Sequence, residues 1–214
     1  MFTHNFDPVI VDLYIFQLRW YSLSYILGIL LGWMYARKIL NKLNNNTDSL
    51  YLKIKDFDDL IPYLVIGIIL GGRLGYVLIY NFDYFSNNLH EIFYVWNGGM
   101  SFHGGGIGVI LSTIYFSYKK NISSLIYLDI VACVAPIGLF LGRISNFING
   151  ELYGKSTNLP WGVIFPNAGT LARHPSQLYE AILEGLLLFV ILNFLAFKKK
   201  LIFRNGLISV YFLF

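Results

Sequence analysis

Five apolar stretches dominate this 214-residue sequence and suit helices that cross a lipid bilayer. A helix rises about 1.5 Å per residue, so a hydrocarbon core of about 30 Å requires about 20 apolar residues. The stretches are Trp20–Tyr35, Leu60–Tyr80, Gly98–Tyr118, Leu125–Phe147 and Gln177–Phe197. A sixth stretch, Gly206–Phe214, begins in the same style but is too short to cross. The sequence therefore predicts an all-α integral membrane protein with five complete transmembrane helices and the start of a sixth.

The composition argues against most soluble alternatives. Only 13% of the residues are charged and the mean hydropathy is +0.58, whereas an ordinary globular domain carries about 25% charged residues. A soluble enzyme, a disordered tail and a repeat protein all fit this composition poorly. The single cysteine, Cys133, excludes an internal disulfide and a cysteine-rich zinc site, and the four histidines do not fall at metal-ligand spacings. We expect no metal, no cofactor and no nucleic-acid partner.

The basic residues indicate the orientation in the membrane. Most of the 16 Lys and Arg residues lie in the loops after the first, third and fifth stretches: Arg37, Lys38, Lys42, Lys53, Lys55, Lys119, Lys120, Lys198, Lys199, Lys200 and Arg204. The other side holds only Arg19, Lys155 and Arg173. Because cytoplasmic loops carry the excess of positive charge, we predict that the N-terminus lies outside. We expect no removable signal peptide, and we interpret residues 1–214 as a single polytopic membrane domain.

The polar residues of the spans gather in the outer half of the membrane: Arg73, His103, Arg143, Asn146, Glu180 and Glu184. Tyr21 opens the first span from the same side, and Asp129, near the inner end of the fourth, is interpreted as a local partner. A charged side chain at mid-membrane costs about 2.5–3.5 kcal/mol, so such residues usually face a polar cavity. In one interpretation the arginines pair with the glutamates and hold the bundle together. In the other they line a pocket for an anionic group, since the arginine fork matches phosphate oxygens.

Glycines recur at four-residue spacing in several spans, as in Gly28/Gly32, Gly67/Gly71/Gly75, Gly104/Gly108 and Gly138/Gly142. Small residues at this spacing let helix backbones approach closely in lipid, so packing is their expected role. Gly104-Gly105-Gly106, which follows His103, has a second possible role, because its backbone N–H groups suit an anion.

Four segments together resemble a known family. They are Gly71–Tyr76 (GGRLGY), Gly98–Gly105 (GGMSFHGG), Gly142–Glu151 (GRISNFINGE) and Arg173–Glu180 (RHPSQLYE). Their order and spacing are similar to the signature stretches of bacterial phosphatidylglycerol–prolipoprotein diacylglyceryl transferases. The Asp7-Pro8-Val9 and Trp20-Tyr21 elements match as well, so the resemblance covers essentially the whole chain.

The resemblance implies a reaction, two substrates and a location. The family moves the diacylglyceryl group of phosphatidylglycerol onto the lipobox cysteine of an exported prolipoprotein, so that a thioether forms and glycerol phosphate leaves. The expected partners are phosphatidylglycerol, prolipoprotein signal peptides with a lipobox cysteine, and membrane lipid. The expected place is the bacterial cytoplasmic (inner) membrane, with the active site toward the outer leaflet.

The resemblance also implies roles for individual residues. The catalytic residues would be His103, Arg143, Asn146 and Glu151. Substrate would be bound by Tyr21, Arg73, Gly104, Arg143, Gly154, Arg173, Gln177 and Glu180. His103 is the candidate base for the thiol, with a structural hydrogen bond between spans as its alternative. Arg143 is the expected phosphate clamp, and Gly154 is expected to allow a close approach of the backbone.

Two departures from the family pattern leave alternatives open. The family usually has glycine at the position of Ser145, whose hydroxyl we expect between Arg143 and Asn146. The family pattern also has seven spans, with a further essential arginine and glutamate in the sixth, whereas this sequence ends at Phe214. One alternative is therefore a truncated, inactive relative that binds phospholipid. Another is a small membrane transporter of anions that uses the same arginines.

Overall fold

The computed structural model describes residues 2–14, 17–46, 53–198 and 206–213, without the side chains of residues 45 and 46. It divides into two compact units, Met1–Lys38 with Asp129–Phe214, and Ile39–Leu128.

The prediction of a mostly helical chain with several apolar spans is confirmed. Four helices in the described part of the chain are long and apolar enough to cross a membrane: Trp20–Asn44, Ile54–Tyr80, Ser124–Asn149 and Ser176–Lys198. They contain the first, second, fourth and fifth predicted spans. The helix of the third predicted span is not among them; it begins at Phe102 instead of Gly98 and has 19 residues. Gly98 and Gly99 have positive φ angles, which a helix does not accommodate.

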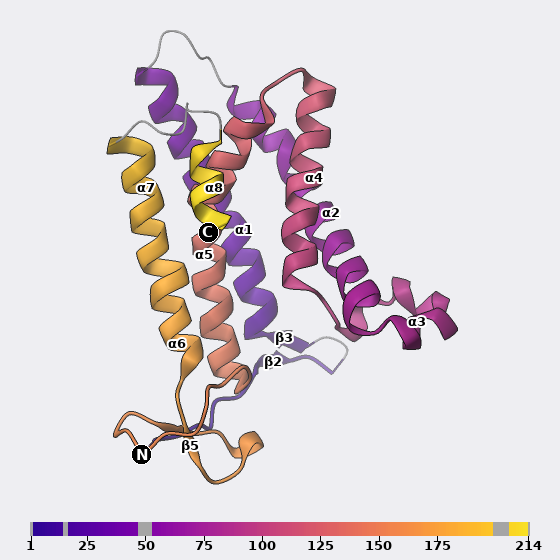
Figure 1. Cartoon of the computed structure of the whole chain (residues 1–214), viewed down its shortest axis with the longest axis vertical. Helices are drawn as coiled ribbons and strands as arrows, with labels where there is room; N and C mark the ends of the chain where they lie inside the picture. Colours follow the sequence, from indigo (N-terminus) through magenta and orange to yellow (C-terminus); the bar gives the residue numbers. More distant parts are fainter. Residues whose placement is uncertain (1, 15–16, 47–52, 199–205, 214) are drawn as a thin grey trace. The chain divides into compact units, whose positions relative to one another are not determined.

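Three long helical segments build the first unit (Figure 1). They are α1 (Trp20–Asn46), α5 (Ser124–Asn149) and a continuous segment made of α6 (Ser176–Glu180), η5 (Ala181–Leu187) and α7 (Leu188–Lys198). The last residues of α1 and the first residues of α5 belong to the second unit. Tyr35 on α1 donates a hydrogen bond of 3.0 Å to the side chain of Asn193 on α7. Asn193 in turn donates to the backbone oxygen of Cys133 on α5 at 3.2 Å. These polar contacts fix the register of the three segments.

Asp129 anchors the short helix α8 (Leu207–Leu213) to α5. Its Oδ1 accepts hydrogen bonds from the backbone N–H of Ser209 at 2.7 Å and from the Ser209 hydroxyl at 2.9 Å. The N–H groups of a first helical turn lack partners within the helix, so a buried carboxylate there serves as a cap. The prediction that Asp129 has a local partner is confirmed.

The prediction of an all-helical chain is incomplete, because short strands occur where the first unit's helices end in loops. They are β1 (Phe2–Thr3), β2 (Val9–Asp12), β3 (Gln17–Arg19), β4 (Val163–Ile164) and β5 (Ala172–Arg173), and the 3₁₀ turn η4 (Pro166–Ala168) lies between the last two. β1 pairs in parallel with β4, β4 pairs antiparallel with β5, and β2 and β3 form a separate antiparallel pair. His4 ties this sheet to α5, because its Nε2 lies 2.7 Å from the backbone oxygen of Phe147. Such short strands carry no recognisable alternation of polar and apolar residues.

The second unit is built on two packed helices, α2 and α4, joined by short helical turns. Its elements are α2 (Ile54–Gly75), η1 (Tyr76–Tyr80), α3 (Phe82–Asn87), η2 (Leu89–Phe93), η3 (Val95–Asn97) and α4 (Phe102–Lys120).

Glycines form the contact between α2 and α4, as their spacing predicts. A Cβ added at Gly71 would overlap the backbone oxygen of Gly104, and one at Gly108 would overlap that of Gly67. The partners run in opposite order along the two helices, so the helices pack antiparallel along this glycine contact. A Cβ at Gly138 or at Gly142 would meet nothing within 4 Å, so this pair departs from the packing interpretation, although a Cβ at Gly28 would lie 3.2 Å from Cα of Gly138.

We expect Gly108→Val to destabilise the second unit by about 1–3 kcal/mol, because the added side chain must push the two backbones apart. The measurement is thermal unfolding in detergent. Gly106→Ala is the matched control on the same helix, because a Cβ at Gly106 meets nothing within 4 Å. Equal unfolding temperatures for Gly108→Val and the control would contradict the packing role.

Candidate active site

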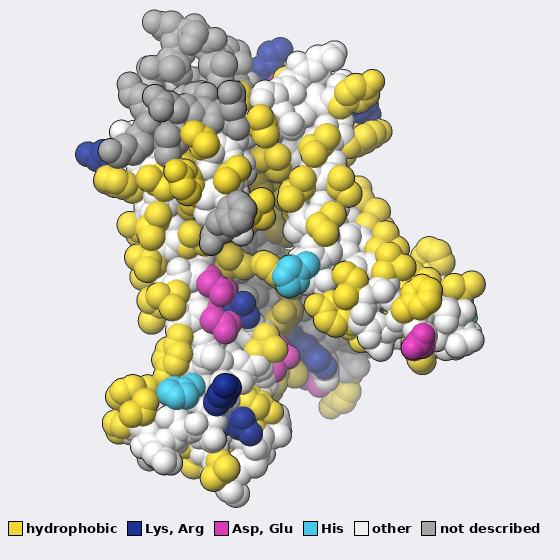
Figure 2. Space-filling model, viewed as in Figure 1, with side chains coloured by type: hydrophobic (Ala, Val, Ile, Leu, Met, Phe, Trp, Pro, Cys, Tyr) yellow, Lys and Arg dark blue, Asp and Glu magenta, His cyan; other side chains and the backbone are white. Residues whose placement is uncertain are grey.

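Arg143 binds two carboxylates within the first unit. Its Nη1 lies 2.8 Å from Oε2 of Glu180, and its Nη2 lies 3.0 Å from Oε2 of Glu184. Its Nε donates a longer hydrogen bond of 3.3 Å to the same Glu184 oxygen. Figure 2 shows acidic and basic side chains side by side on this face, with hydrophobic side chains around them. The ion-pair interpretation of the sequence is thus correct for Arg143.

The two carboxylates leave some N–H groups of the Arg143 guanidinium without a hydrogen-bond partner in the described part of this unit. Arginine has five N–H groups in one plane. Glu184 accepts hydrogen bonds from Nε and Nη2, whereas Nη1 faces Oε2 of Glu180 at 2.8 Å as an ion pair without a hydrogen bond. The N–H groups of Nη1 and one N–H of Nη2 are therefore left without a hydrogen-bond acceptor among the described residues of this unit. The Arg143 side chain is 27% exposed. Nη1 and Nη2 together form the end of the guanidinium, an edge that can bind a phosphate bidentately.

A π-helical segment, η5, carries the second of these carboxylates. It interrupts the fifth predicted span at Ala181–Leu187 and contains Glu184 and Gly185. A Cβ at Gly185 would come within 2.6 Å of Cβ of Phe140, so α5 approaches this segment as closely as glycine permits. Single π-helical turns inside α-helices occur frequently at functional sites. The close approach places Glu184 beside Arg143.

Glu151 is the centre of a second polar cluster at the end of α5. Its Oε1 accepts hydrogen bonds from the side-chain amides of Asn146 at 3.0 Å and Asn149 at 3.2 Å. Gln177, which is fully buried, donates to its backbone oxygen at 2.5 Å. The Oε1 of Gln177 is buried without a hydrogen-bond partner among the described residues. Three residues that the resemblance implies for the site are thereby held together.

The sequence suggested that the hydroxyl of Ser145 lies between Arg143 and Asn146, and this expectation is wrong. Its hydroxyl donates to the backbone oxygen of Trp20 at 3.2 Å, at the start of α1. Adjacent residues of a helix point about 100° apart, so the hydroxyl can face α1 while its neighbours face elsewhere. Tyr21, the next residue of α1, packs edge-on against Tyr25 with ring centroids 5.1 Å apart.

Gly154 and Arg173 belong to the looped part of the first unit. A Cβ at Gly154 would lie 3.0 Å from Cβ of His174, so the backbones pass each other closely there. Arg173 donates to the backbone oxygen of Gly154 at 3.2 Å, and its guanidinium lies 5.0 Å from the ring centroid of Tyr153. Both contacts hold Arg173 against the loop, but its Nε is buried without a hydrogen-bond partner among the described residues.

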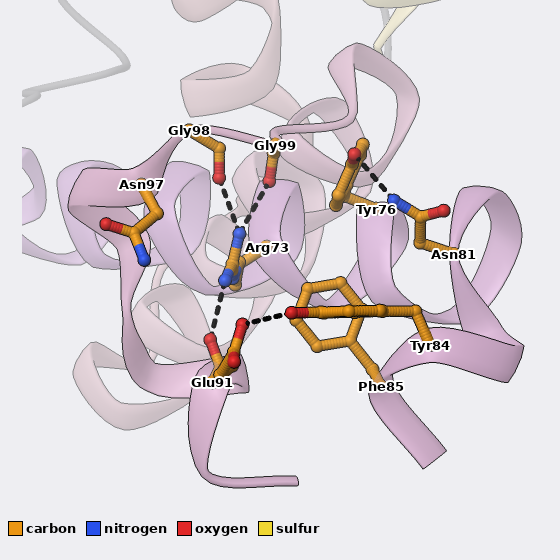
Figure 3. A pocket seen from close by; sticks show the side chains of 9 residues that line it. All are labelled: Arg73, Tyr76, Asn81, Tyr84, Phe85, Glu91, Asn97, Gly98 and Gly99. Carbon is orange, nitrogen blue, oxygen red and sulfur yellow. Dashed lines mark hydrogen bonds between the residues drawn. The ribbon is translucent and has the colours of Figure 1, made fainter. Parts of the chain in front are cut away.

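Arg73, in the second unit, binds backbone oxygens rather than the glutamates, so the ion-pair interpretation is wrong for this residue. Its Nε donates to Ile92 at 2.9 Å, its Nη2 to Glu91 at 2.6 Å, and its Nη1 to Gly98 and Gly99 at 2.5 and 3.2 Å (Figure 3). The residue is only 5% exposed. These oxygens end the short turns η2 and η3, where carbonyl groups lack partners in the helix.

A cavity of about 170 Å³ lies beside Arg73. Figure 3 shows its lining residues, which are Arg73, Tyr76, Asn81, Tyr84, Phe85, Glu91, Asn97, Gly98 and Gly99. Tyr84 donates to Oε2 of Glu91 at 2.7 Å, and this hydrogen bond raises the pKa of the Tyr84 hydroxyl. No sequence pattern indicated that Arg73 anchors these backbone oxygens, because backbone oxygens are available in every loop.

His103 and Gly104 begin α4, directly after the segment that Arg73 holds. Ser101 caps the helix by accepting a hydrogen bond of 3.1 Å from the backbone N–H of Gly104, and its own N–H donates to Gly72 at 2.8 Å. His103 is exposed, and no described residue of the second unit makes a hydrogen bond to its ring. Gly104 is buried against α2. Its N–H already has a partner in Ser101 and is therefore not free for an anion.

Comparison with known proteins gives a consistent result. A family model described as prolipoprotein diacylglyceryl transferase matches residues 8–214. The phosphatidylglycerol–prolipoprotein diacylglyceryl transferase of Rickettsia canadensis (strain McKiel) is 51% identical over 97% of this chain and 78% of its own length. The enzyme of the same name from Rhodopseudomonas palustris (strain ATCC BAA-98 / CGA009) is 51% identical over 97% of this chain and 73% of its own length. That from Rickettsia typhi (strain ATCC VR-144 / Wilmington) is 50% identical over 100% and 81%.

Proposed function

The chain belongs to the prolipoprotein diacylglyceryl transferase family, and from this premise we propose how its residues carry out the reaction. It is a multi-pass membrane enzyme that transfers the diacylglyceryl group of phosphatidylglycerol to prolipoproteins. The acceptor in our proposal is the thiol of the lipobox cysteine. A carbon–sulfur bond forms at the glyceryl carbon, the carbon–oxygen bond to phosphate breaks, and glycerol phosphate leaves.

The free edge of the Arg143 guanidinium is the observation that carries this assignment. Negative charge builds on the phosphate as the carbon–oxygen bond breaks, and a fixed guanidinium stabilises that charge more than it stabilises the ground state. Glu180 and Glu184 hold the guanidinium in place from its other side. In this scheme the glutamates are positioning residues, and a phosphate contact for Glu180 is not required.

Asn146 and Glu151 supply the second part of the proposed site. The carboxylate of Glu151 fixes the side-chain amide of Asn146, which lies one turn from Arg143 on the same helix. An amide has two N–H groups, so Asn146 keeps one for the phosphate or glycerol of the donor. Tyr21, Gly154 and Gln177 then shape the wall of the site and do not take part in bond making.

We further propose five membrane spans with the N-terminus outside, in the bacterial inner membrane. The glycine contacts support α4 as a span, because α4 packs antiparallel along α2. The loops after the first, third and fifth spans carry most of the positive charge, which places them in the cytoplasm. The Arg143 site, at the opposite end of α5, then opens toward the outer leaflet.

His103 is the proposed acceptor of the thiol proton, and its variants test the scheme. The assay transfers labelled diacylglyceryl from phosphatidylglycerol to a lipobox peptide, using the full chain in detergent. Removal of a general base costs about 10²–10⁴-fold, so we expect such a loss for both His103→Ala and His103→Gln. The exposed His90, in the same unit, gives the matched control His90→Ala. Near-normal activity of His103→Gln, which keeps hydrogen bonding but cannot take the proton, would assign His103 a structural role.

A further inference from the structure

The last turn of α5 ends in a tight backbone motif that brings Glu151 back onto Asn146. Gly150 leaves the helix with a φ of 66°, and its backbone N–H donates to the backbone oxygen of Phe147 at 3.0 Å. The backbone N–H of Glu151 donates to the backbone oxygen of Asn146 at 3.1 Å. These two hydrogen bonds after a left-handed glycine define a Schellman motif. The contact between the side chains of Glu151 and Asn146 is therefore built on the backbone that ends the helix.

His4 adds a third hydrogen bond to this motif from a distant part of the chain. Its Nε2 lies 2.7 Å from the backbone oxygen of Phe147, and because a carbonyl oxygen can only accept, Nε2 carries the hydrogen. The same oxygen thus receives two donors, the N–H of Gly150 and the imidazole N–H of His4. Carbonyl groups in the last turn of a helix lack partners within the helix. His4 is only 7% exposed, so its hydrogen bond is shielded from water and is costly to lose.

Aromatic side chains fix the orientation of the His4 ring. Phe6 and Phe147 meet the ring edge-on, with ring centroids 5.3 and 5.5 Å away. Phe165 lies 5.3 Å away, and its plane is tilted by 33° from that of the imidazole. A Cβ at Gly150 would lie 3.2 Å from Cε1 of His4, so the ring also rests on the glycine of the motif. Because close-packed side chains are held in one rotamer, the imidazole N–H stays directed at the end of α5.

The small sheet of the first unit holds the backbone of His4. β1 pairs with β4, and the backbone N–H of His4 continues this pairing by donating to the backbone oxygen of Ile164 at 2.8 Å. On its other side β4 pairs with β5, which leads into α6 and Gln177. Gln177 is the donor to the backbone oxygen of Glu151. The same sheet therefore carries two side chains, His4 and Gln177, that fix the backbone at the end of α5.

We propose that His4 is a positioning residue for the transfer reaction, acting through Phe147 on the pair of Asn146 and Glu151. The proposal rests on the function given above, in which Asn146 presents one N–H to the phosphate or glycerol of the donor. The direction of that N–H depends on how the last turn of α5 is held, because Asn146 and Phe147 are consecutive in it. A small displacement of a group that meets the transition state lowers the rate even when the fold stays intact. In this role His4 touches no substrate and transfers no proton.

Two substitutions separate the hydrogen bond of His4 from its packing. His4→Gln offers an amide N–H in place of the imidazole N–H, whereas His4→Phe keeps a ring among the aromatic side chains and loses the donor. For His4→Phe we expect kcat of the folded protein to fall about tenfold or more, with KM for phosphatidylglycerol nearly unchanged. His4→Gln should restore most of this loss. Phe6→Leu is the matched control, because it removes a neighbouring ring and leaves the hydrogen bond, so its kcat should equal that of the unmodified chain. An unchanged kcat for His4→Phe, or equal losses for His4→Phe and His4→Gln, would overturn the proposal.

Hydrogen exchange locates the effect without relying on turnover. The backbone N–H groups of Gly150 and Glu151 should exchange faster in His4→Phe than in His4→Gln or the unmodified chain, while exchange in α4 stays the same. Unchanged exchange at these two residues in His4→Phe would refute the anchoring, and faster exchange with normal transfer would refute the positioning role. If the unmodified chain transferred no diacylglyceryl to the lipobox peptide, the proposed function would fail. The exchange measurement would still decide whether His4 holds the end of α5.

Discussion

Arg143→Ala should reduce diacylglyceryl transfer by about a hundredfold or more, since loss of one preorganised charge contact in a transition state costs about 2.7–4 kcal/mol. Arg143→Lys should recover little, because an ammonium group cannot present two parallel N–H groups to a phosphate while bound to Glu180 and Glu184. The measurement is the transfer of labelled diacylglyceryl to a lipobox peptide. Activity within threefold of the unmodified chain for Arg143→Ala would remove this residue from the mechanism.

A triple variant separates chemistry from stability at this site. Arg143→Ala leaves two carboxylates without their cation, and an unpaired charge in a partly buried site destabilises the fold. In Arg143→Ala with Glu180→Gln and Glu184→Gln, no charge is left unpaired, so thermal stability should return toward that of the unmodified chain. Activity should stay lost. Recovery of both would mean that Arg143 serves only to hold the helices together.

Arg73→Met should destabilise the second unit on the order of 3 kcal/mol, because four backbone oxygens lose a charged donor. Hydrogen exchange should become faster in residues 89–101, which contain these oxygens and the cap of α4. Transfer activity should fall together with the stability of this segment, since residues 89–101 position His103. The KM for phosphatidylglycerol of the protein that stays folded should be nearly unchanged.

The control for this substitution is Arg19→Met, at an exposed arginine of the first unit. A surface change of this kind should alter stability by no more than about 0.5 kcal/mol. If Arg73→Met showed normal hydrogen exchange and a raised KM, Arg73 would be a ligand of the phosphate, as the resemblance implied. The pair of measurements therefore decides between a structural and a substrate-binding arginine.

Several features could be predicted from the sequence because they depend on local patterns. Four of the five spans follow from runs of apolar residues, and the family follows from motifs such as GGRLGY and GRISNFINGE. The glycine contacts between α2 and α4 follow from spacing, since residues four apart share one face of a helix. Membership of the transferase family argues against the alternative, raised from the sequence, that the chain is an anion transporter.

The partners of the polar groups could not be predicted in the same way. Arg73 and Arg143 both lie in apolar spans, yet one binds backbone oxygens and the other binds carboxylates. Every loop offers carbonyl groups, so no sequence pattern marks the four backbone oxygens to which Arg73 donates. The short strands at Phe2–Thr3 and Val163–Ile164 escaped prediction because they are stable only as a pair that the fold brings together.

The sequence by itself determined the membrane class, the positions of the charged residues along the apolar helices and the family. Each depends on residue type and spacing along one helix, where the helical period relates the sequence directly to the structure. Only the tertiary structure decided that Glu151 joins Asn146 to Gln177, that Ser145 faces α1, and that Arg143 lies between Glu180 and Glu184. These arrangements arise between residues distant in the chain, and the directional hydrogen bonds and close packing that select them exist only once the helices have met.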